Sequence, residues 1–235
     1  GTEQDSDVTS RAIGKCAVFF EHEALKTDLD KKQVVFLPPS GQETIVPYDL
    51  LIGSDGAASV VRNAVLEKNT QELKMELLDH SYKELHIDAF PDGSPRIDME
   101  SLHIWPRGEY MMIALPNPDK SFTVTLFLPN EGKDSFAALK SEADIKEFFS
   151  RVFPDSLALM PGFLDDFKTN PLGSLGTVRC YPWIHGDSAF LIGDAAHAIV
   201  PFHGQGMNCG FEDCEAFDRL LDSEVDMASV LEKFQ

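Results

Sequence analysis

The sequence lacks any cysteine pattern that indicates a disulfide framework or a zinc site. Its four cysteines, Cys16, Cys180, Cys209 and Cys214, form no CxxC motif and have no histidines at zinc-finger spacing. Small secreted domains and structural zinc sites depend on such patterns, so neither class is predicted here, and no metal site is expected. The cysteine usage favours a reducing compartment, and we expect a cytoplasmic protein.

Basic residues and long apolar runs are also scarce. The 235 residues include 20 Lys and Arg against 39 Asp and Glu, a net charge of −19, which argues against nucleic acid as a partner. The longest apolar stretches, such as 111–115 and 188–193, are far shorter than the roughly 20 residues of a spanning helix. The polar start GTEQDSDVTSR has no signal-peptide core. No membrane span is predicted, although a membrane anchor after Gln235 stays open.

What the sequence does contain is an alternation of strand-like and helical segments. The runs CAVFF (16–20) and QVVFL (33–37) are rich in β-branched and aromatic residues and predict strands. The segment YDLLIGSDG predicts a buried strand that ends at Gly53, followed by a helix from about Ser59 to Glu67. Residues 142–153 place apolar side chains at helical spacing and end at Pro154, which predicts an amphipathic helix.

Between residues 82 and 128 the pattern predicts a meandering sheet with turns at PDGSP, PRGE and PNPDK. In residues 110–115 the even-numbered and the odd-numbered positions are both apolar, so we expect both faces of that strand to be covered. In the next strand Thr123, Thr125 and Phe127 share a face that is partly polar, which is suited to lining a pocket.

The most informative stretch is SAFLIGDAAHAIVPFHGQGMN, in which an apolar strand leads to an acid, a glycine-rich loop and a helix. Asp194 follows the strand directly, where its carboxylate can accept hydrogen bonds from ribose hydroxyls. The helix that begins near Gly206 to Asn208 offers free N–H groups to an anionic ligand edge. Residue by residue, a capping Asp and glycines that permit tight turns explain the pattern equally well.

The whole string, GDAAH followed by PxxGQGMN, resembles the second FAD fingerprint of the class A flavoprotein aromatic hydroxylases. The resemblance implies that Asp194 binds the FAD ribose and that Pro201, Gly206, Met207 and Asn208 face the flavin. An earlier string, DLLIGSDGAASVVR, resembles the DG motif of the same enzymes, which implies a role in FAD and NADPH binding for Asp55, with Gly56 and Arg62 at the other motif positions. The looser FFEHEALK implies an adenine contact at Ala24.

Within this class, LHIWPRGEYMMIALPNPDKSFTVTLFLP resembles the kynurenine 3-monooxygenase family. The resemblance covers most of residues 45–221 and implies an apolar wall over an aromatic substrate. It also implies a cover loop beside that wall, which contains Phe202, His203 and Gln205. Ordinary core packing is the commoner role for Met and Leu. Since nothing beside His203 suggests an acid–base pair, it is assigned a contact role only. The implied substrate-contacting residues are Leu102, Met111, Ile113, Leu115, Phe127, Phe202, His203 and Gln205.

The resemblance implies an α/β (mixed α+β) fold with a partial Rossmann-like FAD-binding domain and a mixed β-sheet substrate domain of the aromatic-hydroxylase type. We expect FAD-binding parts at 1–70 and 176–235 and the substrate domain at 71–175. The implied cofactors are FAD and NADPH, and the implied reaction hydroxylates L-kynurenine with O2 to 3-hydroxykynurenine. The protein would orient the ring and exclude water, with no catalytic side chain needed.

One departure from the family is large, because no GxGxxG turn precedes Asp55. We therefore expect a fragment that binds FAD poorly by itself. Two alternatives stay open at this point: a class A hydroxylase that acts on another phenol, and a non-enzymatic binding module derived from a flavoprotein. The preference for NADPH over NADH and the oligomeric state are not predicted.

Overall fold

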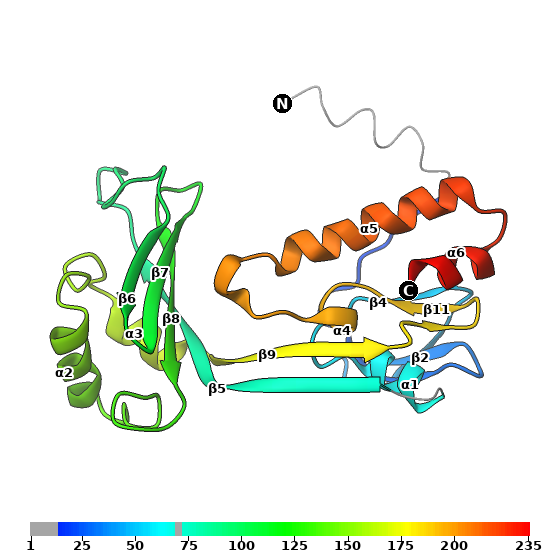
Figure 1. Ribbon diagram of the computed structural model, residues 1–235, viewed down its shortest axis with the longest axis horizontal. Coiled ribbons are helices and arrows are strands. Elements are labelled where there is room, and N and C mark those ends of the chain that lie inside the picture. Colours follow the sequence, from blue (N-terminus) through cyan, green and yellow to red (C-terminus); the bar gives the residue numbers. More distant parts are fainter. Residues whose placement is uncertain (1–13, 69–71) are drawn as a thin grey trace. The chain divides into compact units, whose positions relative to one another are not determined.

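The computed structural model describes residues 14–68 and 72–235, and it divides the chain into two compact units. The first unit consists of Gly1–Glu72, Cys180–Ala196 and Gly210–Gln235, and the second of Leu73–Arg179 and His197–Cys209. The chain thus passes from the first unit to the second, returns to the first at Cys180, enters the second again at His197, and ends in the first from Gly210 (Figure 1). Within the described residues, no helix is long and apolar enough to cross a membrane.

The first unit contains two small sheets. Strands β1 (Glu23–Asp28), β2 (Gln33–Leu37) and β3 (Thr44–Pro47) form an antiparallel sheet in that order. The second sheet has the order β10 (Ile184–His185), β11 (Ala189–Leu191) and β4 (Leu51–Gly53), and β11 pairs with β4 in parallel. Parallel pairing places the carboxyl ends of β4 and β11 at one edge, where the loops that follow both strands begin.

Helices enclose the parallel pair of strands. Helix α1 (Val60–Glu67) packs Val61, Val65 and Leu66 against Leu191 and the short helix α4 (Asp194–His197). On another surface Phe190 contacts Phe217 of α5 (Gly206–Ser223), with ring centroids 4.5 Å apart, and α6 (Met227–Phe234) adds further apolar side chains. Strand β11 is therefore buried along its whole length, as expected for a short apolar strand.

Gly53, the last residue of β4, packs too tightly for a side chain. A Cβ atom there would lie 2.8 Å from Val61 Cγ1 and 2.9 Å from Leu191 Cδ2. Because both neighbours are buried, we expect Gly53→Ala to lower the free energy of unfolding by about 1–3 kcal/mol. Urea denaturation measures this loss, and Gly14→Ala, where a Cβ meets nothing within 4 Å, is the control. An equal stability of the two variants would contradict the prediction.

The second unit is a five-stranded sheet covered on one face by helices (Figure 1). Its strand order is β6 (His103–Arg107), β7 (Tyr110–Pro116), β8 (Phe122–Pro129), β5 (Glu72–Ile87) and β9 (Leu172–Tyr181), and the pairs β6–β7, β7–β8 and β5–β8 are antiparallel. Helices α2 (Glu142–Val152) and α3 (Phe163–Thr169) pack on the face that carries the core side chains. That core includes Leu85, Met112, Ala114, Val124 and Leu126.

Helix α2 shows how local sequence specifies an element of this unit. Ser141 and Asp144 form a capping box, in which the Ser141 hydroxyl accepts from Asp144 N while the Asp144 carboxylate accepts from Ser141 N. The four apolar residues at helical spacing, Ile145, Phe148, Phe149 and Val152, are all buried, as predicted. The helix ends before Pro154, which cannot donate the next backbone hydrogen bond.

Three expectations from the sequence are wrong in detail. Residues 16–20 form no strand, and the strand begins instead at Glu23; Val18, Phe19 and Phe20 are 70–81% exposed. Only one face of β7 is fully covered in this structure, because Leu115 on the other face is 52% exposed. The strand that ends at Gly53, β4, is not buried throughout, because Ile52 is 45% exposed. In each case an apolar pattern marks a surface that the described chain does not fully cover.

Candidate functional site

The loop after β11 is drawn tightly against α5. Gly193 has a positive φ of 58°, and its N–H donates to Asp213 Oδ2 at 2.6 Å. Its Cα lies 3.6 Å from the position that a Cβ of Gly210 would take. This arrangement turns the chain sharply after the strand. Asp194 is exposed there, and its carboxylate makes no hydrogen bond to the described residues. Its carboxylate is free to accept from a ligand.

Helix α4, which starts at Asp194, is anchored from beneath by two buried side chains. Arg62 Nη1 donates to the carbonyl oxygen of Ala195 at 3.1 Å, and Cys180 Sγ donates to that of Ala196 at 3.2 Å. Arg62 Nη2 also donates to Ala57 O at 2.6 Å, so one guanidinium joins the loop after β4 to the loop after β11. Burial raises the pKa of the Cys180 thiol, and the nearby Arg62 charge opposes that shift. The thiol therefore serves as a neutral donor.

Asp55, in the loop after β4, is used by the protein itself. Its Oδ2 accepts from Val60 N at 2.8 Å and Val61 N at 3.2 Å, and its Oδ1 accepts from the Ser59 hydroxyl. These N–H groups form the first turn of α1, which otherwise leaves them without partners. Asp55 thus stabilises the N-terminus of α1, and Gly56, with φ of 78°, completes the turn.

We expect Asp55→Ala to lower the free energy of unfolding by about 1–2 kcal/mol, the usual cost of losing an N-terminal cap. The reason is that two backbone donors and the Ser59 hydroxyl lose their acceptor together. Thermal or urea unfolding measures the change. Asn63→Ala on the exposed side of the same helix is the control and is expected to stay within about 0.5 kcal/mol of the unchanged protein.

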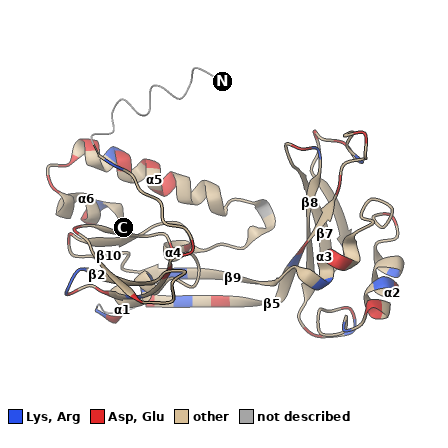
Figure 2. Ribbon diagram, turned by 180° about the vertical axis from the view of Figure 1, so that it is seen from behind, with Lys and Arg blue, Asp and Glu red and all other residues tan. Residues whose placement is uncertain are grey.

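The glycine-rich loop of the second unit ends at the start of α5. Pro201–His203 form a short 3-10 turn, and Gly204 follows with a left-handed φ of 62°. Gln205 accepts from Asn208 Nδ2 at 3.1 Å, and the first intrahelical backbone bond joins Cys209 N to Gln205 O. The N–H groups before Cys209 therefore point beyond the helix. No acidic residue lies in this first turn; acidic residues begin at Glu212 (Figure 2). The turn therefore favours an anionic ligand group.

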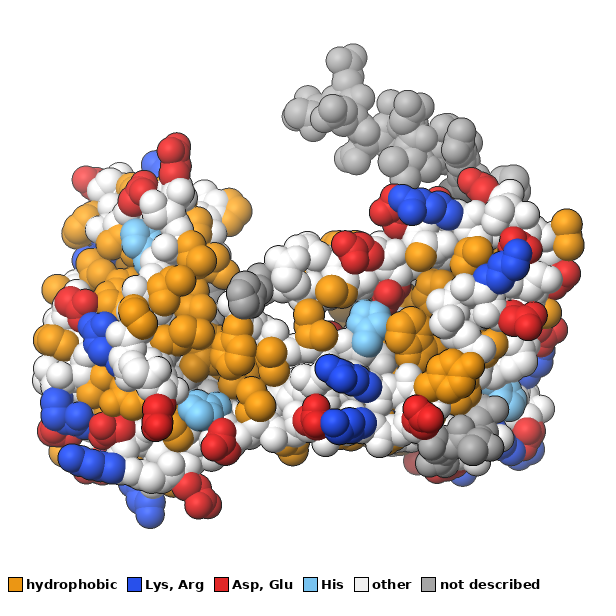
Figure 3. Space-filling model, in the orientation of Figure 1, with side chains coloured by type: hydrophobic (Ala, Val, Ile, Leu, Met, Phe, Trp, Pro, Cys, Tyr) orange, Lys and Arg blue, Asp and Glu red, His pale blue; other side chains and the backbone are white. Residues whose placement is uncertain are grey.

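The sheet face away from α2 and α3 carries the predicted apolar wall. Met111, Ile113 and Leu115 alternate along β7, and their cross-strand partners on β8 are Phe127, Thr125 and Thr123. Leu102 and Leu115 are 56% and 52% exposed. Figure 3 shows hydrophobic side chains gathered over this unit. An exposed apolar sheet face of this kind is typical of a binding surface.

One end of this face is hollowed into a cavity of about 370 Å³. Three of the predicted substrate-contacting residues, Met111, Phe127 and Phe202, line it, and the ring centroids of Phe127 and Phe202 are 5.2 Å apart. Burial and a hydrogen bond to Asp134 raise the pKa of the Tyr110 hydroxyl, which lies on the same rim. The further lining residues are Leu78, Asp79, His80, Pro106, Gly108 and Glu109. The volume and lining suit a small aromatic molecule.

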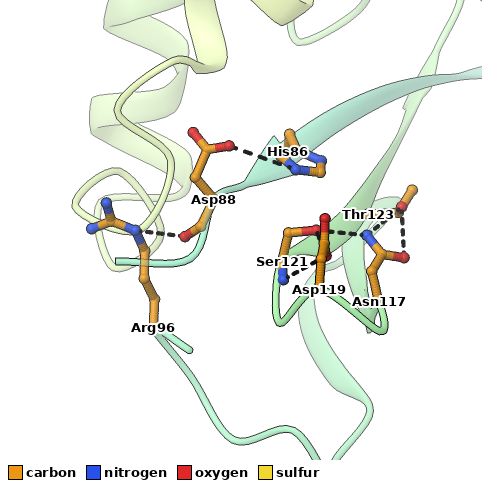
Figure 4. Close-up of polar contacts among 7 residues, drawn as sticks. All are labelled: His86, Asp88, Arg96, Asn117, Asp119, Ser121 and Thr123. Atoms are coloured by element: carbon orange, nitrogen blue, oxygen red, sulfur yellow. Dashed lines mark hydrogen bonds and ion pairs between the residues drawn. The ribbon is translucent and has the colours of Figure 1, made fainter. Parts of the chain in front are cut away.

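The opposite end of the face is polar and ordered by its own hydrogen bonds (Figure 4). Asn117 Nδ2 donates to Ser121 Oγ at 3.0 Å and to Thr123 Oγ1 at 3.2 Å. Asp119 accepts from Ser121 N and Oγ, and these bonds lower the pKa of its carboxyl group. These contacts fix the turn between β7 and β8. They hold the two strands in register, which keeps Met111 opposite Phe127.

The structure places some of the predicted substrate-contacting residues together and others apart. Met111, Phe127 and Phe202 meet at the cavity; Ile113 and Leu115 extend the same face; Leu102 lies just before β6. Ala24 is half-buried in β1, Met207 is 72% exposed in α5, and the His203 side chain lies outside the described part of the structure. Several lining residues were not predicted, among them Leu78, His80 and Tyr110. The fold brings two of them together through strand pairing, because His80 of β5 pairs with Pro129 of β8 and Tyr110 of β7 pairs with Arg107 of β6.

The chain belongs to the FAD-binding domain family, whose family model matches residues 8–223. Curated relatives refine this class. Kynurenine 3-monooxygenase of Flavobacterium psychrophilum is 51% identical over 173 residues, which are 74% of this chain and 39% of that protein. The enzyme of that name from Xanthomonas oryzae pv. oryzae is 50% identical over 190 residues, 81% of this chain and 42% of that protein. The chain thus spans about two fifths of the length of these relatives.

Solved structures with a similar fold come from more distant proteins. The tetrameric form of 2-methyl-3-hydroxypyridine-5-carboxylic acid oxygenase superposes with a TM-score of 0.67 at 19% identity, covering 91% of this chain and 54% of that one. Klebsiella pneumoniae HpxO complexed with FAD and uric acid gives 0.64 at 18% identity, covering 91% and 52%. At these identities the likeness concerns the fold alone, and it confirms the predicted mixed α/β class.

Proposed function

We propose that this chain is part of an FAD- and NADPH-dependent monooxygenase that hydroxylates L-kynurenine to 3-hydroxykynurenine. In the balanced reaction O2 supplies one oxygen atom to the ring and one to water, while NADPH and a proton supply the reducing equivalents. The observation that carries the proposal is the identity of 50–51% with proteins named kynurenine 3-monooxygenase over most of this chain.

In this proposal the first unit serves FAD binding, with Asp194 as the acceptor for ribose hydroxyls. The support is its position at the carboxyl end of a parallel strand with an unused carboxylate. Asp55 acts through α1, because its carboxylate is already bonded to the helix N-terminus. Its role in cofactor binding is therefore indirect, through the position of the loop that Arg62 also holds.

The second unit serves substrate binding and supplies the start of α5. When bound, FAD supplies the oxygen-transfer chemistry, which no side chain of a protein provides. The free N–H groups at Gly206, Met207 and Asn208, with no acid in the first turn, suit the flavin edge that gains negative charge on reduction. Pro201 begins the turn that leads there. Ala24, on β1, is proposed as an adenine contact.

The apolar wall has two tasks toward the substrate. Met111, Phe127 and Phe202 hold an aromatic ring by contact, and Ile113, Leu115 and Leu102 extend the surface that excludes water. Gln205 and His203 of the cover loop are proposed as further contacts. The four cysteines are all unpaired, in keeping with the cytoplasmic location that we propose.

The proposal is tested on the natural gene product that carries this sequence. The purified protein is supplied with FAD, NADPH and L-kynurenine under ¹⁸O2, and the product is analysed by mass spectrometry. We expect 3-hydroxykynurenine with one ¹⁸O atom and NADPH oxidation that depends on kynurenine. Oxidation stimulated by simple phenols but not by kynurenine would point to another aromatic hydroxylase. Failure to bind flavin or to oxidise NADPH with either substrate would favour a binding module instead.

A further inference from the structure

The ring of Tyr82 lies directly on the backbone of Gly173. A Cβ atom at Gly173 would be 2.2 Å from Tyr82 Cζ, 2.3 Å from Cε1 and 2.7 Å from the hydroxyl oxygen. No side chain fits at those distances. Gly173 does not have a positive φ, so its backbone conformation is open to any residue. The position requires glycine solely because the Tyr82 ring occupies the space.

Tyr82 is the first of three aromatic rings in contact across the second unit. It is the register partner of Phe127, and their ring centroids are 6.3 Å apart at 47°. Phe127 in turn contacts Phe202 of the cover loop at 5.2 Å and 59°. Phe127 is only 3% exposed, so its ring cannot turn away without displacing a neighbour. Tilted aromatic pairs at these separations attract each other.

Resting on the function proposed above, we propose that Gly173 and Tyr82 are positioning residues for the substrate ring. Neither has a direct contact with substrate in this assignment. The backbone of β9 at Gly173 sets the height of the Tyr82 ring, Tyr82 sets the orientation of Phe127, and Phe127 sets that of Phe202. Since Phe127 and Phe202 line the cavity, a shift at β9 reaches the substrate through two rings.

The consequence for catalysis is a loss of alignment of the substrate ring. In Gly173→Ala the new methyl group pushes the Tyr82 ring away, and the shift passes to Phe127. A reacting ring that is displaced by even 1 Å loses rate by as much as about 100-fold. When the substrate ring is misaligned, O2 takes the electrons of NADPH and a proton to give hydrogen peroxide, so NADPH continues to be consumed without hydroxylated product.

The activity test uses the natural gene product and compares four forms: unchanged, Gly173→Ala, Tyr82→Ala and the double variant. We expect Gly173→Ala to reduce 3-hydroxykynurenine formed per NADPH oxidised by about tenfold, with kinetics altered more in kcat than in KM. Tyr82→Phe, which keeps the ring, retains the unchanged ratio. The double variant is no worse than Tyr82→Ala, because the methyl group then has no ring to displace.

Gly176→Ala is the matched control, because it also crowds β9 but against Leu77 Cδ2 at 2.9 Å and Glu76 O at 3.1 Å instead of an aromatic ring. It lowers stability without lowering the product ratio. The proposal is overturned if Gly173→Ala keeps the unchanged ratio, if Gly176→Ala lowers it equally, or if the defect persists undiminished after Tyr82 is shortened.

A second measurement does not depend on the proposed reaction. The 235-residue chain has four tyrosines, so labelling with 3-fluorotyrosine gives a small set of ¹⁹F resonances, and Tyr82→Phe identifies that of Tyr82. We expect this resonance to shift in Gly173→Ala and in Phe202→Leu, and to stay in place in Gly176→Ala. If the ¹⁹F resonance of Tyr82 does not shift in Phe202→Leu, the coupling between the rings is refuted. If the coupling is present but kynurenine is not hydroxylated, the proposed function fails and the ring coupling stands.

Discussion

Replacement of Arg62 by methionine is expected to lower the free energy of unfolding by about 2–3 kcal/mol. Arg62 is 2% exposed and donates to the carbonyl oxygens of Ala57 and Ala195. Methionine fills most of the volume but leaves both carbonyls without a donor. Each lost bond to a charged donor is worth about 1.5–3 kcal/mol, and relief from burying the guanidinium offsets part of the sum.

The direction of this effect follows from the absence of a compensating partner. A buried ion pair can be replaced by apolar residues at little cost, since both charges leave together. The acceptors of Arg62 are backbone carbonyls, which stay in place when the side chain is removed. Arg62 Nε has no partner among the described residues, so burying the guanidinium already carries a cost that the substitution relieves. The expected loss of stability is therefore smaller than the sum of two full hydrogen bonds.

Urea denaturation measures the loss, and Arg219→Met is the matched control. Arg219 is 73% exposed and, among the described residues, pairs with Glu215 on the same helix, so the identical substitution there costs at most about 0.5 kcal/mol. The loss of stability in Arg62→Lys is expected to lie between those of the two methionine variants, because a single ammonium group replaces a guanidinium that bonds to two carbonyls. Equal midpoints for Arg62→Met and Arg219→Met would show that the two loops do not depend on this side chain.

Elements whose signals are local were predicted well. Helix α2 carries its cap at Ser141, its apolar stripe and its stop at Pro154 within a single stretch, and it forms as predicted. The start of α5 follows in the same way from the loop before it. The strand predicted at 16–20 fails for the complementary reason. Strand formation depends on a pairing partner, and β2 pairs with Glu23–Asp28, a more polar segment with a bulge between Ala24 and Lys26.

In the candidate site, too, contacts between residues far apart in the sequence were not predicted. The contact of Tyr82 with Gly173 joins positions 91 residues apart (173 − 82), and no local pattern marks Gly173 as a site for a ring. The sequence also does not predict that Arg62 bonds to two loops, because its partner at Ala195 is a backbone carbonyl, which every residue has. Spacing and composition identify candidate residues, but the partner that each one has depends on sheet register and on helix packing.

The two aspartates of the fingerprint strings differ for this reason. Both follow a strand of the same parallel pair, and both were predicted as cofactor contacts. The structure uses the Asp55 carboxylate to stabilise α1, whereas that of Asp194 is left exposed at the end of β11. A substitution at Asp55 is therefore expected to act mainly on stability. One at Asp194 is expected to act on ligand affinity, and the two effects can be separated.

Replacement of Asp194 by asparagine is expected to weaken FAD binding by the natural gene product by about 10–100-fold, with little change in stability. The side chain keeps its shape and its acceptor oxygen but loses its charge, so each hydrogen bond from a ribose hydroxyl loses about 1–1.5 kcal/mol of charge assistance. Stability is preserved because the carboxylate bonds to none of the described residues. Titration of flavin fluorescence measures the affinity, and urea denaturation measures the stability.

Asp218→Asn on α5 is the matched control, since it removes the same charge from an exposed aspartate of the same unit. It corrects for the long-range effect of net charge, which at −19 opposes an anionic dinucleotide, so removing one negative charge slightly favours binding. A loss at Asp194 therefore occurs against this trend and reports the local bond. If both variants bind FAD equally, Asp194 is no ribose acceptor, and its exposure at the end of β11 has another cause.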